Sequence, residues 1–358
     1  MAFSYDQIDS FLHAQHADPF GFLGMHSDPD TGYLTVCTYQ PYATSVKLVS
    51  KANNKTVAVM NHIKNGFFVA ETRRKKHFPY HFNITYGQYQ TDVEDTYRFG
   101  SVLGEFDLYL LGSGGHKHLY QILGAHTREM DGVSGASFVV WAPHAARVAV
   151  LGDFNDWDNR RHVMRKHHDA GYWDIFVPGV TEGANYKFEV RDATGRPLPL
   201  KSDPVGSEAE HRPNTASKIV AHRHYPWQDD EWMTVRGSRC ELDKPISIYE
   251  VHIGSWRKGD NGRFLNYREI AAELVPYVKD MGFTHVQFLP VSEHPFDGSW
   301  GYQPVGLFAP TSRHGSSEDL KALIQAFHRP DVGVVLDWVP GHFRSDGQGL
   351  ARFDGTAV

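Results

Sequence analysis

The feature that most constrains this chain is the stretch 284–343, where two short apolar runs flank an amphipathic segment. The runs cover residues 286–291 and 332–339, and near-continuous apolar strands separated by a helix are typical of parallel pairing. The segment between them begins with a Ser-Ser-Glu-Asp cap at 316–319. It then carries apolar side chains at helical spacing: Leu320, Leu323, Ile324 and Phe327. The stretch therefore predicts a strand-helix-strand unit with a right-handed crossover.

Polar and aromatic residues gather where each predicted strand ends. After the first run come Glu293, His294, Asp297, Trp300 and Tyr302. After the second run come Asp337, Trp338 and His342. Chemistry in parallel α/β folds is built from residues at the carboxyl ends of strands. One interpretation is that Asp337 and His342 only cap the strand and satisfy each other. The Asp-x-x-x-x-His spacing in a Pro-Gly turn, beside an aromatic-rich loop, instead favours a functional site.

The first half of the chain has a different pattern, with short alternating runs punctuated by Pro, Gly and Asn. A helix is expected over residues 4–15, capped by Ser4. Strands follow in residues 33–90, and the plan repeats in residues 137–190. The repeat is visible in the letters, because QPYATSVKLV and APHAARVAVL share Pro, Ala and Val. Two tandem β-sandwiches of immunoglobulin-like type are predicted, and two copies are too few for a solenoid.

From residue 245 the pattern changes to alternating strand and helix, with a strand at 246–252 and a helix at 267–281. This β-α-β-α-β series is the expected opening, the first three units, of a (β/α)8 barrel that is incomplete here. The connector 100–132 is too apolar for a free tether and is expected to pack between modules. The predicted domains are 1–112, a β-sandwich with a leading helix; 113–230, a second sandwich; and 231–358, the first part of the barrel.

Composition excludes several classes of function. The formal net charge of −6 over 358 residues argues against nucleic-acid and membrane partners. No apolar run approaches about 20 residues, and no secretory signal is visible. The two cysteines, Cys37 and Cys240, form no disulfide framework, so a reducing, cytoplasmic location is expected. The paired histidines at 116/118 and 222/224 lack a second ligand pair, so no metal site and no cofactor are expected.

The strand-end motifs also carry a family resemblance. GSWGYQP followed by VVLDWVPGHF resembles the α-amylase superfamily, and EHPFDGSWGYQPVGLFAPTSRHG resembles the glycogen (1,4-α-glucan) branching enzymes. The resemblance implies that Tyr302 stacks on a glucose ring of an α-glucan, while Asp337 and His342 hydrogen-bond the same sugar. Gly341 stands where amylases carry a calcium-binding Asn, which argues against calcium.

A second resemblance concerns the sandwiches. Trp141-Ala-Pro and GDFNDW at 152–157 resemble the starch- and glycogen-associated sandwich of branching enzymes and isoamylases. Trp157 and Trp173 are the candidate glucan-binding aromatics, since flat rings stack on sugar faces. The alternative is that both belong to the sandwich core, where a lone Trp is usually buried. DPFGFLGMH at 18–26 resembles the extra N-terminal module of bacterial branching enzymes.

The resemblance also points to what these residues lack. A retaining glycosidase uses a carboxylate nucleophile and a carboxyl acid/base about 5 Å apart. The family places the nucleophile Asp on strand four and the acid Glu after strand five, beyond the three strands predicted here. The expected function is glucan branching, the transfer of a cut α-1,4 segment to a 6-hydroxyl, with this chain inactive alone. The alternatives are a non-catalytic glucan-binding fragment or pseudoenzyme, and a related trehalose-releasing hydrolase.

Overall fold

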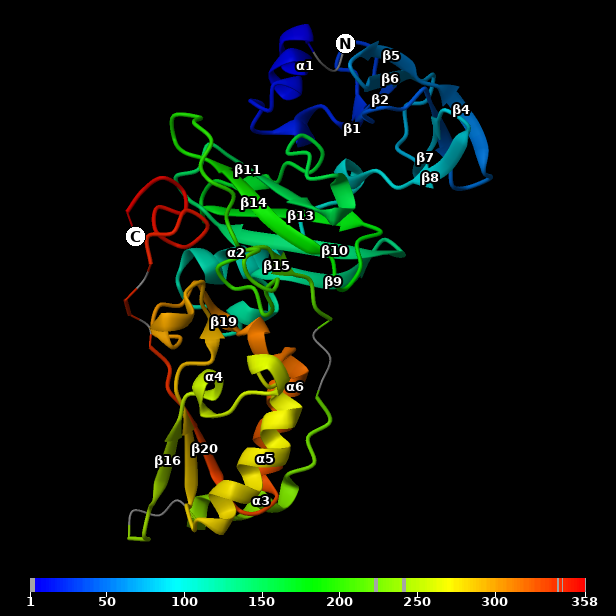
Figure 1. Ribbon diagram of the computed structural model, residues 1–358. Coiled ribbons are helices and arrows are strands. Elements are labelled where there is room, and N and C mark those ends of the chain that lie inside the picture. Colours follow the sequence, from blue (N-terminus) through cyan, green and yellow to red (C-terminus); the bar gives the residue numbers. More distant parts are fainter. Residues whose placement is uncertain (1–3, 222–224, 240–242, 340, 343, 358) are drawn as a thin grey trace. The chain divides into compact units, whose positions relative to one another are not determined.

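The computed structural model describes residues 4–221, 225–239, 243–339, 341–342 and 344–357 (Figure 1). The chain divides into two compact units. One comprises Met1–Leu200 with Arg352–Ala357, and the other comprises Lys201–Ala351. The first unit contains both β-rich modules, and the second contains the alternating strands and helices. Domain boundaries near residues 112 and 230 stay predictions.

The first β-rich module consists of two four-stranded antiparallel sheets. One sheet has the order β1 (Gly24–Ser27), β2 (Leu34–Tyr39), β6 (Phe67–Glu71), β5 (Asn61–Lys64). The other has the order β4 (Lys55–Val59), β3 (Ser45–Ser50), β7 (Tyr80–Tyr86), β8 (Tyr89–Val93). Leu34, Val46 and Phe82 belong to one buried cluster to which both sheets contribute. The longer strands agree with the predicted ones, whereas the short strands β1, β5 and β8 are not marked by the alternation pattern.

The second module repeats this arrangement. One sheet has the order β12 (Arg165–His167), β13 (Tyr172–Pro178), β10 (Val133–Trp141), β9 (Gly124–Met130). A second layer contains the antiparallel pair β11 (Arg147–Gly152) and β14 (Asn185–Arg191). Residues 124–141 supply a hairpin that the alternation pattern had located only in part. The two β-rich modules expected from the sequence are therefore present.

The duplication extends further than the repeat that is visible in the sequence letters. Helix α1 (Tyr5–Leu12) precedes β1, and helix α2 (Glu105–Gly112) precedes β9 in the same way. The ring Nε2 of His26 lies 2.7 Å from the Leu23 carbonyl, and that of His126 lies 2.8 Å from the Leu123 carbonyl. The segment predicted as a connector thus contains the leading helix of the second copy. It is anchored there, because the backbone N–H of Val102 donates to Asp174 in β13 at 2.6 Å.

The two leading helices differ in how strongly the sequence predicts them. Ser4 accepts from the N–H of Gln7, and the Gln7 side chain accepts from the N–H of Ser4, so α1 begins with a capping box. Ile8 and Phe11 then bury one face. Helix α2 begins after Gly104 and buries only Leu111, which joins Leu103 and Val139 in a small cluster. Its apolar residues lie all around the helix, which is why periodicity did not reveal it.

The second unit is built on three parallel strands in the order β16 (Ile248–Val251), β17 (His285–Phe288), β20 (Gly333–Leu336). Helices α5 (Tyr267–Asp280) and α6 (Ser317–His328) connect them and lie on one face of the sheet (Figure 1). The core between sheet and helices includes Val286, Phe288, Ile270, Leu274 and Leu323. Asn266 and Ser316 cap the two helices, each in a capping box. On the opposite face, Ile248 and Val335 are exposed.

Shorter elements complete the second unit. They are β15 (Ser217–Lys218), α3 (Asp230–Arg239), α4 (Ile253–Trp256), β18 (Ser292–Glu293) and β19 (Gly306–Pro310).

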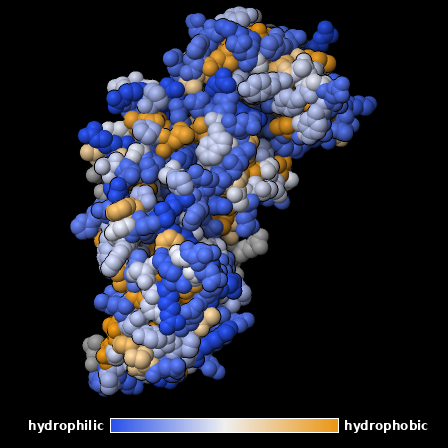
Figure 2. All heavy atoms as spheres, viewed as in Figure 1, coloured by the Kyte–Doolittle hydropathy of each residue, from blue (hydrophilic) through white to orange (hydrophobic). Residues whose placement is uncertain are grey.

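Figure 2 shows polar residues over most of the visible face, with apolar residues in separate small patches. None of the described helices is long and apolar enough to cross a membrane. Within the described ranges no group of three or more His, Cys, Asp or Glu could hold a metal ion. Cys240 and the histidines at 222 and 224 lie outside the described residues.

Candidate functional site

The three parallel strands end in register, which brings the residues that follow them to one edge. Val251, Phe288 and Leu336 are aligned across the sheet. The ladder continues one residue further, since the N–H of Leu289 donates to the Val251 carbonyl at 3.0 Å and that of Asp337 donates to the Phe288 carbonyl at 2.9 Å. His252, Leu289 and Asp337 therefore leave the sheet side by side at its carboxyl edge, where parallel folds place their chemistry.

Tyr302 reaches this edge from the loop between β18 and β19. Its hydroxyl donates to Oδ2 of Asp337 at 2.7 Å. The hydrogen bond to the Asp337 carboxylate raises the pKa of Tyr302, with smaller contributions from burial and from the negative charge of Glu250. The pair joins the loop after β17 to the end of β20. Two of the three residues predicted from the sequence are thus brought into direct contact.

A tight turn aims Tyr302 at Asp337. Gly301 has a φ of +87°, and a Cβ on it would lie 2.2 Å from the carbonyl oxygen of Pro290. No side chain fits this approach, so only glycine lets the loop pass over the end of β17. Trp300, just before it, also has a positive φ, of 55°. The close approach of Gly301 to the Pro290 backbone therefore explains the second glycine of the GSWGYQP motif.

His342, the third predicted residue, is described only by its backbone and its exposure. It follows β20 on a short segment, is exposed, and has a φ of 52°. No hydrogen bond joins it to Tyr302 or Asp337 in the part of the chain that the structure describes. Its neighbours Pro340 and Phe343 are outside the described residues. Its place in the site stays a prediction.

A buried arginine holds the loop that carries Trp300 and Tyr302. The side chain of Arg313 is 3% exposed and donates to Glu293 at 2.8 Å and to Asp297 at 2.8 Å. Glu293 also accepts from the N–H of Ser312 at 2.6 Å. Asp297 receives a second cation, Arg212, at 2.6 Å. The strand-end pattern marks both carboxylates but not Arg313, because nothing local identifies an arginine 16 residues after Asp297 and 20 after Glu293 as their partner.

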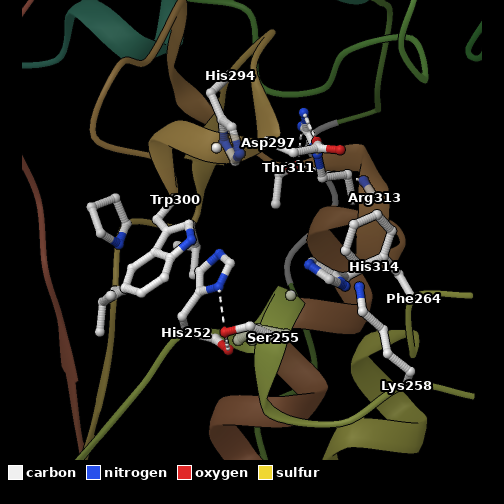
Figure 3. Close-up of a pocket in the computed structure, with 16 residues that line it drawn as sticks. His252, Ser255, Lys258, Phe264, His294, Asp297, Trp300, Thr311, Arg313 and His314 are labelled. Carbon is white, nitrogen blue, oxygen red and sulfur yellow. Dashed lines mark hydrogen bonds and ion pairs between the residues drawn. The ribbon is translucent and has the colours of Figure 1, made fainter. Parts of the chain in front are cut away.

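Beside this network lies a cavity of about 410 Å³ (Figure 3). His252, His294 and His314 project toward it from three sides. The His252 ring stacks on Trp300, with centroids 5.1 Å apart and planes 13° from parallel. Burial lowers the pKa of all three histidines, that of His314 to about 4. Of these wall residues, only His294 and Trp300 are among those that the strand-end pattern in the sequence marks.

The tryptophans proposed for the second sandwich have different environments. Trp173 is 1% exposed and its Nε1–H donates to the Ala142 carbonyl at 2.9 Å. Its ring is part of the core and is not available to a glucan, which corrects that prediction. Trp157 is 38% exposed and stays a candidate. Trp141, at the end of β10, is 52% exposed and was not named as a candidate. Which aromatics are buried depends on strand register, because neighbouring residues face opposite sides.

Comparison with protein families assigns three successive parts of the chain. Residues 4–97 match the N-terminal domain of alpha-1,4-glucan branching enzyme GlgB. Residues 122–206 match carbohydrate-binding module 48, the isoamylase N-terminal domain. Residues 255–352 match the alpha amylase catalytic domain. Two N-terminal β-rich domains followed by part of an amylase catalytic domain is the order expected from the sequence.

Curated relatives match nearly the whole chain. The 1,4-alpha-glucan branching enzyme GlgB of Roseobacter denitrificans is 50% identical over 96% of this chain and 47% of its own length. Those of Rubrobacter xylanophilus and Rhodospirillum rubrum are 51% and 47% identical over 98% of this chain and 48% of theirs. The chain spans about half the length of the curated relatives that it matches. The predicted resemblance to branching enzymes is confirmed.

Proposed function

We propose that this chain, a member of the 1,4-alpha-glucan branching enzyme family that spans about half the length of its relatives, is the glucan-holding part of such an enzyme. The observation that carries the proposal is the 2.7 Å contact between Tyr302 and Asp337 at the carboxyl edge of the parallel sheet. Branching cuts an α-1,4 glucan segment and transfers it to a 6-hydroxyl with retention at the anomeric carbon.

In this proposal Tyr302 and Asp337 bind one glucose unit together. The Tyr302 ring offers a flat apolar face to the sugar, while the Asp337 carboxylate accepts hydrogen bonds from sugar hydroxyls. His342 is the proposed third contact. Hydrogen bonds that tighten as the ring flattens toward an oxocarbenium-like state lower the barrier, by a few kcal/mol on general grounds (roughly 2–4).

We further propose that the three parallel strands are the opening of a (β/α)8 barrel. Helices α5 and α6 cover one face of the sheet, as barrel helices do, and Ile248 and Val335 are exposed on the face that a closed barrel would fill. Retaining chemistry also needs a nucleophile and an acid/base, which we place outside these 358 residues. The chain alone is then expected to bind glucan without turnover.

The rest of the proposal concerns partners and location. The match of residues 122–206 to a carbohydrate-binding module supports a second glucan contact in the sandwich, with Trp157 as its candidate aromatic. We propose α-glucan as the ligand, no nucleic-acid or membrane partner, and a cytoplasmic location. A trehalose-releasing hydrolase is disfavoured, since residues 4–97 match the branching-enzyme N-terminal domain.

The test observes Tyr302 directly. The ring signals of ¹³C-tyrosine are followed while the 358-residue chain is titrated with maltotetraose, and Tyr302→Phe assigns the Tyr302 signal. We expect that signal to shift and saturate, and Asp337→Asn to weaken the apparent affinity about tenfold, the loss of one charged hydrogen bond. A Tyr302 signal that does not shift during the titration would show that the sugar does not bind at this site. A branching assay on the same chain should give no turnover, and activity above background would show that the catalytic carboxylates are present after all.

A further inference from the structure

We infer that the cavity bounded by His252, His294 and His314 is a second saccharide-binding pocket, distinct from the Tyr302–Asp337 site. This inference uses the proposed function only in choosing an α-glucan as the sugar. The cavity has a volume of about 410 Å³, enough for one or two pyranose rings, and it opens between the loop after β16 and the loop after β17 (Figure 3).

The hydrogen-bond pattern of two of the histidines points to a hydroxylated ligand. Nδ1 of His294 lies 2.9 Å from the Ser292 carbonyl, and Nδ1 of His314 lies 2.8 Å from the Leu265 carbonyl. A carbonyl only accepts, so both Nδ1 atoms carry the proton. Burial lowers the pKa of each ring, so both are neutral near pH 7 and each Nε2 is an acceptor. No hydrogen bond from a described residue to either Nε2 is present, which leaves two acceptors on rings that line the cavity.

Other groups in the wall supply donors and apolar surface. The Lys258 ammonium lies 3.6 Å from the centre of the Phe264 ring at one side of the cavity. Trp300 is half exposed and is held in place by its stack on His252. One concave site thus combines neutral acceptors, a flexible donor and aromatic rings. The acceptors and the donor match the hydroxyls of a pyranose, and the aromatic rings match its weakly polar faces.

Two other ligand classes fit less well. A metal ion would use the free Nε2 atoms, but the described residues contain no group of three possible ligands. A phosphate would need several donors, and Lys258 alone supplies too few. Arg313 is already engaged by Glu293 and Asp297, and the two neutral Nε2 atoms would face the anion with lone pairs. A neutral polyhydroxyl ligand is therefore the class that these walls accept.

The pocket is also separate from the first site. His252 and Asp337 follow the two outer strands of the three-stranded sheet, so they lie about 10 Å apart, two strand spacings of about 4.8 Å. Trp300 and Tyr302 belong to the same loop, which gives the two sites one common wall. A single glucan could reach both, or two chains could be held side by side, as a transfer between glucans requires.

The test follows the histidine ring signals of the 358-residue chain during titration with maltotriose. His314→Asn and His294→Asn are the informative variants, because the Asn amide can replace Nδ1–H toward the carbonyl but supplies nothing at the Nε2 position. We expect maltotriose to shift the His294 and His314 signals saturably, and each variant to weaken binding at this pocket about tenfold. Tyr302→Phe should change that affinity less than twofold, and exposed His168→Asn should have no effect.

Each alternative outcome is informative. Lys258→Met removes an exposed donor without touching the core, so weaker maltotriose binding in this variant supports the pocket even if a histidine variant fails to fold. Signals that ignore maltotriose but respond to inorganic phosphate would make this an anion site and overturn the inference. Loss of the histidine shifts in Tyr302→Phe would mean one site rather than two. If the Tyr302 signal itself fails to respond while the histidine signals do, the proposed function fails and the pocket stands.

Discussion

The hydroxyl of Tyr302 donates to the carboxylate of Asp337 at 2.7 Å across 35 residues of sequence. The contact exists because β17 and β20 are adjacent and in register, and because a glycine turn sends the following loop back over the strand ends. It joins an aromatic ring and a carboxylate, the two kinds of group that bind a sugar face and its hydroxyls.

The first prediction concerns the ionisation of this pair. Asp337→Asn should lower the pKa of Tyr302 toward its ordinary value of about 10, because the carboxylate that accepts its proton and opposes phenolate charge is gone. Glu250→Gln should act in the same direction but less, since Glu250 contributes only its charge. The pKa is measured from the ¹³C ring signal of Tyr302 between pH 8 and 12. Equal values in the parent chain and in Asp337→Asn would show that the contact is absent in solution.

A second prediction isolates the turn that presents Tyr302. Gly301→Ala should destabilise the second unit and abolish the maltotetraose response of Tyr302, because its Cβ would lie 2.2 Å from the Pro290 oxygen. Gly262→Ala is the matched control. It has a φ of +76° but nothing within 4 Å, so it carries only the left-handed backbone penalty of about 1–2 kcal/mol. Denaturant unfolding and the tyrosine titration are compared for both. Equal effects would mean that the Pro290 contact is unimportant.

A third prediction concerns acid stability of the first unit. Burial lowers the pKa of His162 to about 3, and the Asn155 amide donates to its Nδ1 at 2.9 Å. The unfolded chain takes up this proton near pH 6.5, so the stabilisation is complete above that pH and is lost as pH falls toward 3. At pH 5 the loss is about 2 kcal/mol. His162→Asn should flatten the pH dependence of the unfolding free energy between pH 7 and 5, and exposed His168→Asn should leave it unchanged.

A fourth prediction has the opposite sign. Burial raises the pKa of Asp95 to about 6, although the Tyr80 hydroxyl donates to it. The folded chain therefore binds this proton more tightly than the unfolded chain, so this group's contribution to stability falls as pH rises from about 4 to 6. Asp95→Asn keeps an acceptor for Tyr80 and removes the titration. On acidification from pH 6 to 4, the variant should therefore lose more unfolding free energy than the parent chain. An equal change in the two chains would mean that Asp95 is in contact with water and that its pKa is not raised.

A fifth prediction separates the two sandwich tryptophans. Trp173→Ala should cost about 3–5 kcal/mol of unfolding free energy, because it empties a buried site next to Val140 and Ala142. Trp157→Ala should cost less than about 1 kcal/mol, since its ring is partly exposed. Only the second variant is expected to weaken retardation of the chain in glycogen-containing native gels. Retardation that survives in Trp157→Ala but falls in the variant Trp141→Ala would transfer the glucan contact to Trp141.

The sequence by itself determined the local elements. Caps at Ser4 and Ser316 predicted where helices begin, because a cap and its helix lie within four residues, and the structure contains a capping box at each. Alternation located the longer strands, and the strand-helix series predicted parallel pairing. Short edge strands and helix α2 were missed, since a few residues of weak periodicity carry too little pattern.

Tertiary structure alone decided which of these residues meet. Strand register placed Asp337 beside the end of β17 and buried Trp173 while leaving Trp141 exposed. The packing of loops joined Arg313 to Glu293 and Asp297. It also turned three histidines from separate segments toward one cavity. Such contacts depend on strand pairing and loop closure over tens of residues. A local sequence pattern reports only periodicity and capping. It therefore contains no information about which residues meet when they are tens of residues apart in the chain.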